Sequence, residues 1–486
     1  MNRHRTPNNA WFVARFPGCL VLAAVVAAAF PVNAVFIGVA AAGSAVAFAA
    51  IYIFIYRMKQ FRISWILADG LLLGYSVGTL NTGVRLALEG STAAIQFARP
   101  QEQLSMALAA SLLVSAVLFF VGSAAEKPIR IDTLSVRRSD LRFVWLGLAV
   151  ELAAFATGGI GYMGTVADAR NHVTMLGEIA GVWGPALPAV TVFFFPRCPR
   201  GLSRAACWLL LAAALLCLVP QGRRVLLYAV LLTFFASGVS TGGRLSIRKH
   251  LPLIIAAAPL LYVGNIVFYA MRVSSWQAGS ARLSVTELSA RAAGILRVGK
   301  DAAFDQKVEE NLRDRTFVLS YLSDLLAASW THEPLFGRDL LFSIRMAVPS
   351  IIYPNKDSVR AIGMEENLVN PEFGLYAEDD ANSILTTGVS DLGAVGIFLY
   401  PVALSLLIGA FTRTLARHLP QIVRAIVVFT VVGVIWRTEI GFSGYFILCR
   451  DLIILSIPLA ILKMWDRAVR PPDWNQSPAK GLDYAS

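Results

Sequence analysis

The chain has 486 residues, of which 56% are hydrophobic and 15% are charged, and its mean hydropathy is +0.62. This composition excludes an ordinary soluble protein, because many apolar runs approach the roughly 20 residues that cross about 30 Å of hydrocarbon as a helix. The net charge of +12 does not indicate a nucleic-acid partner, since the basic residues fall mostly in short links on one side of the predicted spans.

The first 270 residues are predicted to form an N-terminal membrane domain of about nine spans. A basic start precedes the first apolar run, which we interpret as a retained span rather than a cleaved signal peptide because a second run follows at once. Glu151, near mid-depth of the fifth span, is interpreted as a structural or helix-pairing residue. The predicted spans are Trp11–Phe30, Asn33–Tyr56, Trp65–Leu88, Leu104–Ser123, Phe143–Ile160, a sixth ending at Pro196, Ala205–Val219, Val225–Val239 and Leu251–Ala270.

Residues 271–383 form the one long hydrophilic stretch, predicted to be a partly helical periplasmic loop. Ser284 and Glu287 have the spacing of a capping box, which predicts the start of a helix. An apolar stripe predicts a second helix over Ala303–Ser329, and Pro334 and Gly337 are expected to end it. None of the five cysteines lies in this stretch, so a disulfide framework is excluded there.

Residues 384–486 are predicted to form a C-terminal membrane domain of about three spans with a cytoplasmic tail. These spans are Thr386–Phe411, Ile422–Trp436 and Phe446–Met464. The predicted fold class is an all-α polytopic membrane protein of about twelve transmembrane helices with both termini in the cytoplasm.

Charges that topology does not explain indicate where chemistry takes place. Arg223 and Arg224 lie in a predicted tight outer hairpin, where they either reach outer-leaflet headgroups or bind a lipid diphosphate. Arg437, in the last outer turn, and Arg450, one turn inside the membrane, allow the same two interpretations. Their alternative is local pairing with Glu439 and Asp451, respectively.

In the long loop, Arg345, Lys356 and Arg360 form either a basic pocket or a solvated, mixed-charge face. Asp379 and Asp380, directly before the membrane is re-entered, supply either a general base or an N-terminal cap of the next span. His332 is a rival base. No Cys/His cluster has zinc-ligand spacing, and we expect neither a metal nor a cofactor.

Several segments resemble the Wzy-type oligosaccharide repeat-unit (O-antigen) polymerases, relatives of the O-antigen ligases, mainly in the C-terminal half. They are the turn Gly222-Arg223-Arg224, the segments 334–337 and 347–356 of the loop, and Asn382 with residues 388–396. A single dominant outer loop late in the chain is also similar to that family. The family often has arginine after the first proline of the second loop segment, where this chain has Ser350.

The resemblance implies a GT-C-like, metal-independent glycosyltransferase of the bacterial inner membrane. Its substrates would be polyprenyl diphosphate-linked oligosaccharides in the bilayer, and its partners a chain-length regulator and a flippase. Arginine would stabilise the leaving diphosphate. The candidate catalytic residues are Arg223, Arg224, Arg345, Asp379 and Asp380, and the candidate substrate-binding residues are Arg272, Arg338, His332, Lys356, Arg360, Arg437 and Arg450.

Two other functions fit parts of the pattern. An O-antigen ligase-like enzyme would use the same donor with a different acceptor, and the sequence does not separate the acceptors. A flippase or other transporter would have short loops and an internal repeat, whereas this loop has roughly 110 residues. The loop therefore favours the enzyme.

Overall fold

The computed structural model describes residues 140–156, 175–194, 202–221, 223–240, 247–278, 285–298, 317–349, 352–353, 365–375, 382–435 and 440–469, with ten single positions between 100 and 118. Every regular element in these ranges is a helix, which confirms the all-α prediction for this part of the chain. The predicted spans before residue 140 lie outside the continuous described ranges.

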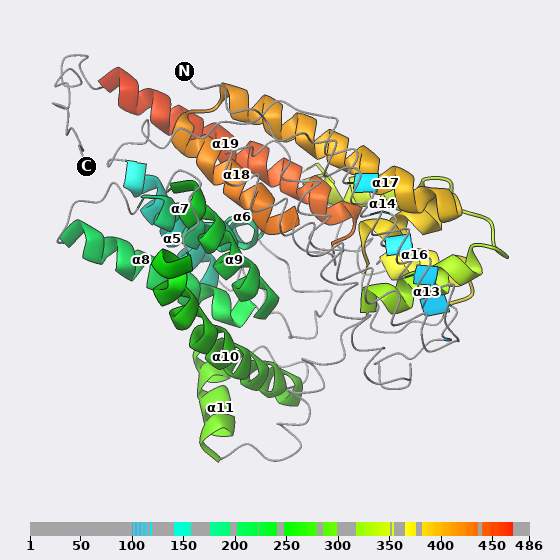
Figure 1. Cartoon of the computed structure of the whole chain (residues 1–486), viewed down its shortest axis with the longest axis horizontal. Coiled ribbons are helices and arrows are strands. Elements are labelled where there is room, and N and C mark those ends of the chain that lie inside the picture. The colour runs from blue at the N-terminus through cyan, green and yellow to red at the C-terminus, as the bar shows by residue number, and fades with distance from the viewer. Residues whose placement is uncertain are drawn as a thin grey trace.

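Three long helices form the C-terminal part of the protein: α17 (Ile384–His418), α18 (Gln421–Ile435) and α19 (Phe442–Val469). They pack against one another and run along one edge of the molecule in Figure 1. Two segments, Ile384–His418 and Phe442–Trp465, are long and apolar enough to cross a membrane, which supports membrane association. The count of about twelve spans and the GT-C-like arrangement remain predictions.

The helix α17 is interrupted in its first half at Gly393, whose backbone is non-helical with φ 61° and ψ −150°. Glycine adopts this conformation without the steric penalty that a side chain would impose. The two parts of α17 then approach each other so closely that a Cβ on Gly396 would lie 1.7 Å from the carbonyl oxygen of Gly388. The glycines of this segment thus permit a sharp fold within a predicted span.

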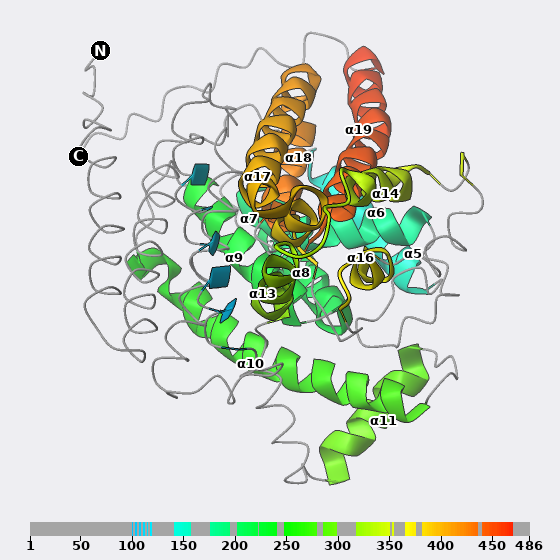
Figure 2. The ribbon, with the colours of Figure 1, turned by 90° about the vertical axis from the view of Figure 1, so that its right-hand side faces the viewer.

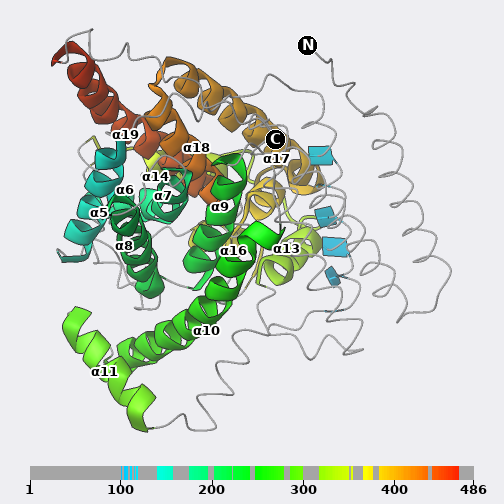
Figure 3. The same cartoon turned by 60° about the vertical axis from the view of Figure 1, so that its left-hand side comes forward.

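Among the described residues, the N-terminal bundle consists of short helices interrupted by two 3-10 turns. In chain order these are α5 (Leu141–Ala156), α6 (Met175–Trp183), η4 (Gly184–Ala186), α7 (Leu187–Phe194), α8 (Leu202–Leu218), η6 (Val219–Gln221) and α9 (Arg223–Ser240). Phe429 of α18 packs edge-to-face on Phe193 and Phe235, with ring centroids 5.7 and 6.1 Å apart. The helix α18 therefore joins this bundle to the C-terminal helices (Figure 3).

Two helices extend away from this bundle. The helix α10 (Ile247–Ala278) continues the ninth predicted span, and α11 (Val285–Val298) packs back on it through Met271, Leu288 and Ala292. The start of α11 confirms the helix predicted from the capping-box spacing. In Figures 1 and 2 the pair projects from the lower side of the molecule, away from the C-terminal helices.

The other described loop helices are α13 (Phe317–Ala328), α14 (Arg338–Ala347) and α16 (Glu365–Glu372). The helix α13 packs on α17, α14 packs on α17 and α19, and α16 packs on α14. The helix α13 confirms the C-terminal part of the predicted helix over Ala303–Ser329, whose first part lies outside the described residues. Leu322 belongs to the same buried cluster as Phe193 and Val389. The described loop helices thus share one core with α7 and α17.

Candidate functional site at helix α14

The first turn of α14 is capped by a side chain from α17. Gly337 occupies the N-cap position with φ 88° and has no side chain that can accept from the free N–H groups. Asp391 takes this role: its Oδ1 accepts from the backbone N–H of Asp339 and its Oδ2 from that of Leu340, both at 2.9 Å. A carboxylate at a helix N-terminus is also stabilised by the helix dipole, so Asp391 fastens α14 to α17.

The chain leading into α14 is bound to the interruption of α17. The backbone N–H groups of Leu335 and Phe336 donate to the carbonyl oxygens of Ser390 and Asp391, both at 2.9 Å. A continuous α17 would pair these two carbonyls with N–H groups four residues ahead, and the break at Gly393 makes them accessible. The kink in α17 is therefore the docking point of this part of the loop.

Four buried side chains complete this junction. Ser390 donates to Asp339 Oδ2 at 2.8 Å, and the hydroxyl of Tyr400 donates to Asp391 Oδ2 at 2.9 Å. Asp339, Ser390 and Asp391 are each 1% exposed or less, so their hydrogen bonds are shielded from water. We call Asp339, Ser390, Asp391 and Tyr400 the α14–α17 junction.

Next to the junction, Phe336 is held in the left-handed region with φ 49°, a strained conformation for a bulky residue, and its side chain is 76% exposed. Its N–H bond to α17 helps to maintain this conformation. This backbone conformation places the aromatic ring of Phe336 in solvent beside α14.

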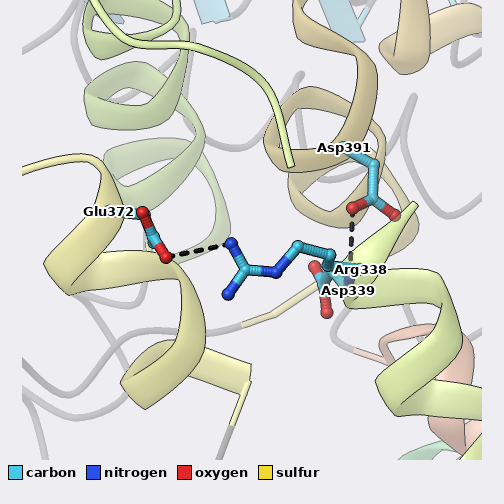
Figure 4. Close-up of polar contacts among 4 residues, drawn as sticks. All are labelled: Arg338, Asp339, Glu372 and Asp391. Carbon is cyan, nitrogen blue, oxygen red and sulfur yellow. Dashed lines mark hydrogen bonds and ion pairs between the residues drawn. The ribbon is translucent and has the colours of Figure 1, made fainter. Parts of the chain in front are cut away.

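Two predicted substrate-binding residues flank the end of α16. Arg338 points away from the junction and forms an ion pair with Glu372 at 3.0 Å, and both side chains are about half exposed (Figure 4). His332 is exposed, and its ring centroid lies 6.0 Å from that of Phe373. The structure thus brings an imidazole, a carboxylate and a guanidinium to one exposed edge.

At the other end of α14, Arg450 of α19 donates from Nη1 to the carbonyl oxygen of Ala347 at 3.3 Å. Its Nε is also paired with Asp451 at 2.7 Å, so the predicted local alternative for Arg450 is confirmed. Arg345 lies exposed in the last turn of the same helix. Cations near a helix C-terminus are favourable, and Arg345 and Arg450 both lie at this end of α14. Together with Arg338 in its first turn, α14 carries or contacts three predicted arginines.

The other predicted arginines stand on different elements. Arg223 and Arg224 begin α9, whose main partners are α7, α10 and α18, whereas α14 packs on α19, α17 and α16. Arg272 lies in α10 and is partly buried. That Arg223, Arg224 and Arg345 act on one diphosphate stays a prediction.

The remaining predicted residues, Asp379, Asp380, Lys356, Arg360 and Arg437, lie outside the described residues. One alternative for the acidic pair is wrong, however. The N-cap of α17 is Ser383, whose hydroxyl accepts from the N–H of Thr386 while Thr386 accepts from the N–H of Ser383. Asp380 therefore is not the N-cap residue, because the N-cap of α17 lies three residues after it, at Ser383.

Sequence reasoning did not single out the α14–α17 junction. Asp391 is a charged residue inside a predicted apolar span, the same signal that drew attention to Arg450. Its partner Asp339 gave no signal, because nothing in the sequence relates positions 52 residues apart.

Comparisons with known proteins give no further guide to the site. No family model matches the chain, and neither a curated protein nor a solved structure is significantly similar to it. The resemblance to the Wzy-type polymerases therefore rests on the sequence segments alone.

Proposed function

We propose that this protein is an integral-membrane glycosyltransferase that polymerises lipid-linked oligosaccharide repeat units. It transfers glycan from a polyprenyl diphosphate carrier to a sugar hydroxyl of the incoming repeat unit, at the periplasmic face of the bacterial inner membrane. The product would be a surface polysaccharide.

One observation carries this proposal: two segments that resemble the polymerase family are in direct contact. Segment 334–337 donates two backbone hydrogen bonds to the interruption of α17, which lies within segment 388–396. Segment 347–356 begins at the end of α14, where Arg450 binds Ala347. Sequence positions about fifty residues apart thus form one structure, as a shared role in one site requires.

The chemistry of α14 suits a departing diphosphate. Negative charge grows on the leaving group, and fixed guanidinium groups stabilise it without reorganisation. Arg345 is exposed and fixed to a helix that is anchored at both ends, by Asp391 and by Arg450. In the proposal Arg345 acts with Arg223 and Arg224, and Asp379, Asp380 or the exposed His332 accepts the proton of the attacking hydroxyl.

The proposed mechanism requires no metal ion. A chelator such as EDTA is therefore expected to leave the rate of the purified protein unchanged when it is assayed with lipid-linked repeat units. Inhibition that added magnesium reverses would contradict this part of the mechanism.

The decisive experiment is deletion of the gene followed by gel electrophoresis of surface glycans. Products carrying a single repeat unit are expected, because chain extension alone would be lost. Accumulation of finished, lipid-linked polymer would instead indicate a ligase, and precursor retained in the cytoplasm would indicate a flippase.

The predicted topology has an independent test. A single cysteine introduced at exposed Trp330 is expected to react with a membrane-impermeant maleimide in intact spheroplasts. A cysteine at exposed Trp465, near the cytoplasmic end of α19, is the matched control and is expected to react only after lysis. Labelling of position 330 only after lysis would place the loop in the cytosol and exclude the proposal.

A further inference from the structure

A buried carboxylate lies between the two interruptions of the N-terminal bundle. Glu151, on α5, is 1% exposed. The turn η4 packs on α5, α8 and α9, and the turn η6 packs on α8, α9 and α10. Figures 1 and 3 show α5 to α9 gathered together. Glu151 is thus a buried acid beside two breaks in regular helices. The free backbone groups of such breaks are tolerated at membrane depth only where protein or a polar site satisfies them.

Glu151 is bound to the turn between α8 and α9. Gln221, 5% exposed and the last residue of η6, donates from Nε2 to Glu151 Oε1 at 3.0 Å and to the carbonyl oxygen of Cys217 at 3.2 Å. Gly184 makes room for the carboxylate, because a Cβ there would lie 2.5 Å from Oε1. One side chain thus links α5 to the turn that precedes α9.

The two carboxylate oxygens of Glu151 differ, because only Oε1 accepts a hydrogen bond from Gln221. Neither Glu151 Oε2 nor the nearby Trp183 Nε1 has a hydrogen-bond partner among the described residues. Trp183 packs on Gly147, one helical turn before Glu151. Burial of an acid without a full set of partners is costly. An ionisable side chain at this depth is therefore a candidate for a functional role beyond packing.

The nearest charges along the chain from this contact are two arginines. Arg223 and Arg224 begin α9, two and three residues after Gln221. The start of α9 is held by Val225 and Leu226, which pack against Leu260 and Leu261 of α10. The backbone of the arginine pair is therefore fixed on both sides, by an apolar contact to α10 and by the polar contact of Gln221 with Glu151.

We propose that Glu151 is a positioning residue for the Arg223–Arg224 turn. Its carboxylate holds the turn through Gln221 and thereby fixes where the backbone of the two arginines leaves the bundle. This inference rests on the proposed function, in which the two arginines bind the diphosphate. It replaces the interpretation of Glu151 as a structural residue alone.

The native thiol of Cys217, one turn before Gln221, provides a test of the positioning that does not depend on enzymatic activity. In a variant in which the other four cysteines are alanine, alkylation of Cys217 by N-ethylmaleimide reports the opening of the turn. Glu151→Ala and Glu151→Gln both remove the acid beside the Cys217 thiol, and only the glutamine keeps the bond from Gln221. Glu151→Ala is therefore expected to be alkylated roughly fivefold faster than Glu151→Gln, because one buried hydrogen bond is lost. Equal rates in the two variants would overturn the positioning role.

A further control separates this contact from general packing. Thr191→Val, which removes a buried hydrogen bond of the neighbouring helix α7, is the control and is expected to have no effect. Faster alkylation in the Thr191 variant would show that the thiol reports general loosening and would overturn the assignment to Glu151.

The positioning is also tested by the polymer. Glu151→Ala is expected to slow polymerisation roughly tenfold, a change in transition-state stabilisation of ~1.4 kcal/mol, at an unchanged protein level. Glu151→Gln keeps the contact with Gln221 and is expected to retain most of the rate. Normal polymer in Glu151→Ala, or an equal loss in Glu151→Gln, would overturn the positioning role. If gene deletion leaves the surface glycans unaltered, the proposed function fails while the alkylation result still stands.

Discussion

Asp391 makes three hydrogen bonds with its side chain, from two backbone N–H groups of α14 and from the hydroxyl of Tyr400. A carboxylate in an apolar span would otherwise be expensive, but the positive end of α14 offsets its charge. Arg338, in contrast, forms an exposed pair with Glu372, and exposed pairs contribute little to stability. The buried contact with Asp391, rather than the exposed Arg338–Glu372 pair, therefore holds α14 in place.

Replacement of Asp391 by alanine is expected to loosen α14. The change removes the cap and leaves two N–H groups without an acceptor, which costs about 1–2 kcal/mol for a cap and more where the groups are buried. Faster limited proteolysis between α13 and α14 would report it. Ser405→Ala, on the same helix, is the control, because the buried Ser405 hydroxyl has no partner among the described residues. Equal proteolysis of the two variants would contradict the capping role.

Arg345 is expected to affect the reaction rather than the fold, since its side chain is exposed. Arg345→Ala should reduce polymer formation roughly a hundredfold at an unchanged protein level, as removal of a donor to a developing anion does. Arg345→Lys should recover little, because an ammonium group does not bind phosphate oxygens in bidentate geometry. The measurement is polymer length on gels, and Arg291→Ala, an exposed arginine of α11, is the control. A normal ladder for Arg345→Ala would exclude it from the site.

At the scale of elements, the interruption of α17 is the decisive feature. It frees the carbonyls of Ser390 and Asp391 and brings two parts of one helix into close contact at Gly388 and Gly396. The loop then packs on the interruption rather than on a regular helix surface. A continuous helix of the same sequence would offer α14 neither an acceptor nor a cap at this position.

This arrangement predicts different effects for two glycines of α17. Gly396→Ala is expected to destabilise the protein strongly, because its Cβ would overlap the backbone of Gly388. Gly409→Ala is expected to be neutral or to stabilise by up to about 1 kcal/mol, since no atom lies within 4 Å of its Cβ position and alanine favours the helix. Thermal unfolding in detergent compares the two. Similar Tm values would show that the close approach is absent.

At the scale of the whole molecule, the described loop helices are not a separate unit. Tyr321, Leu322 and Leu325 of α13 belong to a buried cluster shared with α7, α17 and α18. Tyr321 also donates to Asn370 of α16 at 2.9 Å, so the loop helices are tied to one another as well as to the core.

A fragment containing residues 285–383 alone is therefore expected to remain largely unfolded. It lacks Asp391 and Arg450, which bind the two ends of α14, and it lacks the apolar surface on which α13 packs. Far-ultraviolet circular dichroism of the purified fragment would measure this. A cooperative thermal transition of the fragment would contradict a core shared with the membrane helices.

Hydropathy, helical periodicity and capping residues are local properties, and they predict the all-helical class of the described residues and the approximate positions of α5, α8 to α11, α13 and α17 to α19. The sequence also indicates Arg338, Arg345, Arg450 and His332 from their charge in unusual places. Two contacts are visible in the folded protein alone: Asp391 caps α14, and Glu151 binds Gln221. These contacts join positions 52 and 70 residues apart, and their hydrogen bonds arise when a helix breaks and another element fills the gap. Local sequence patterns do not predict such a pairing.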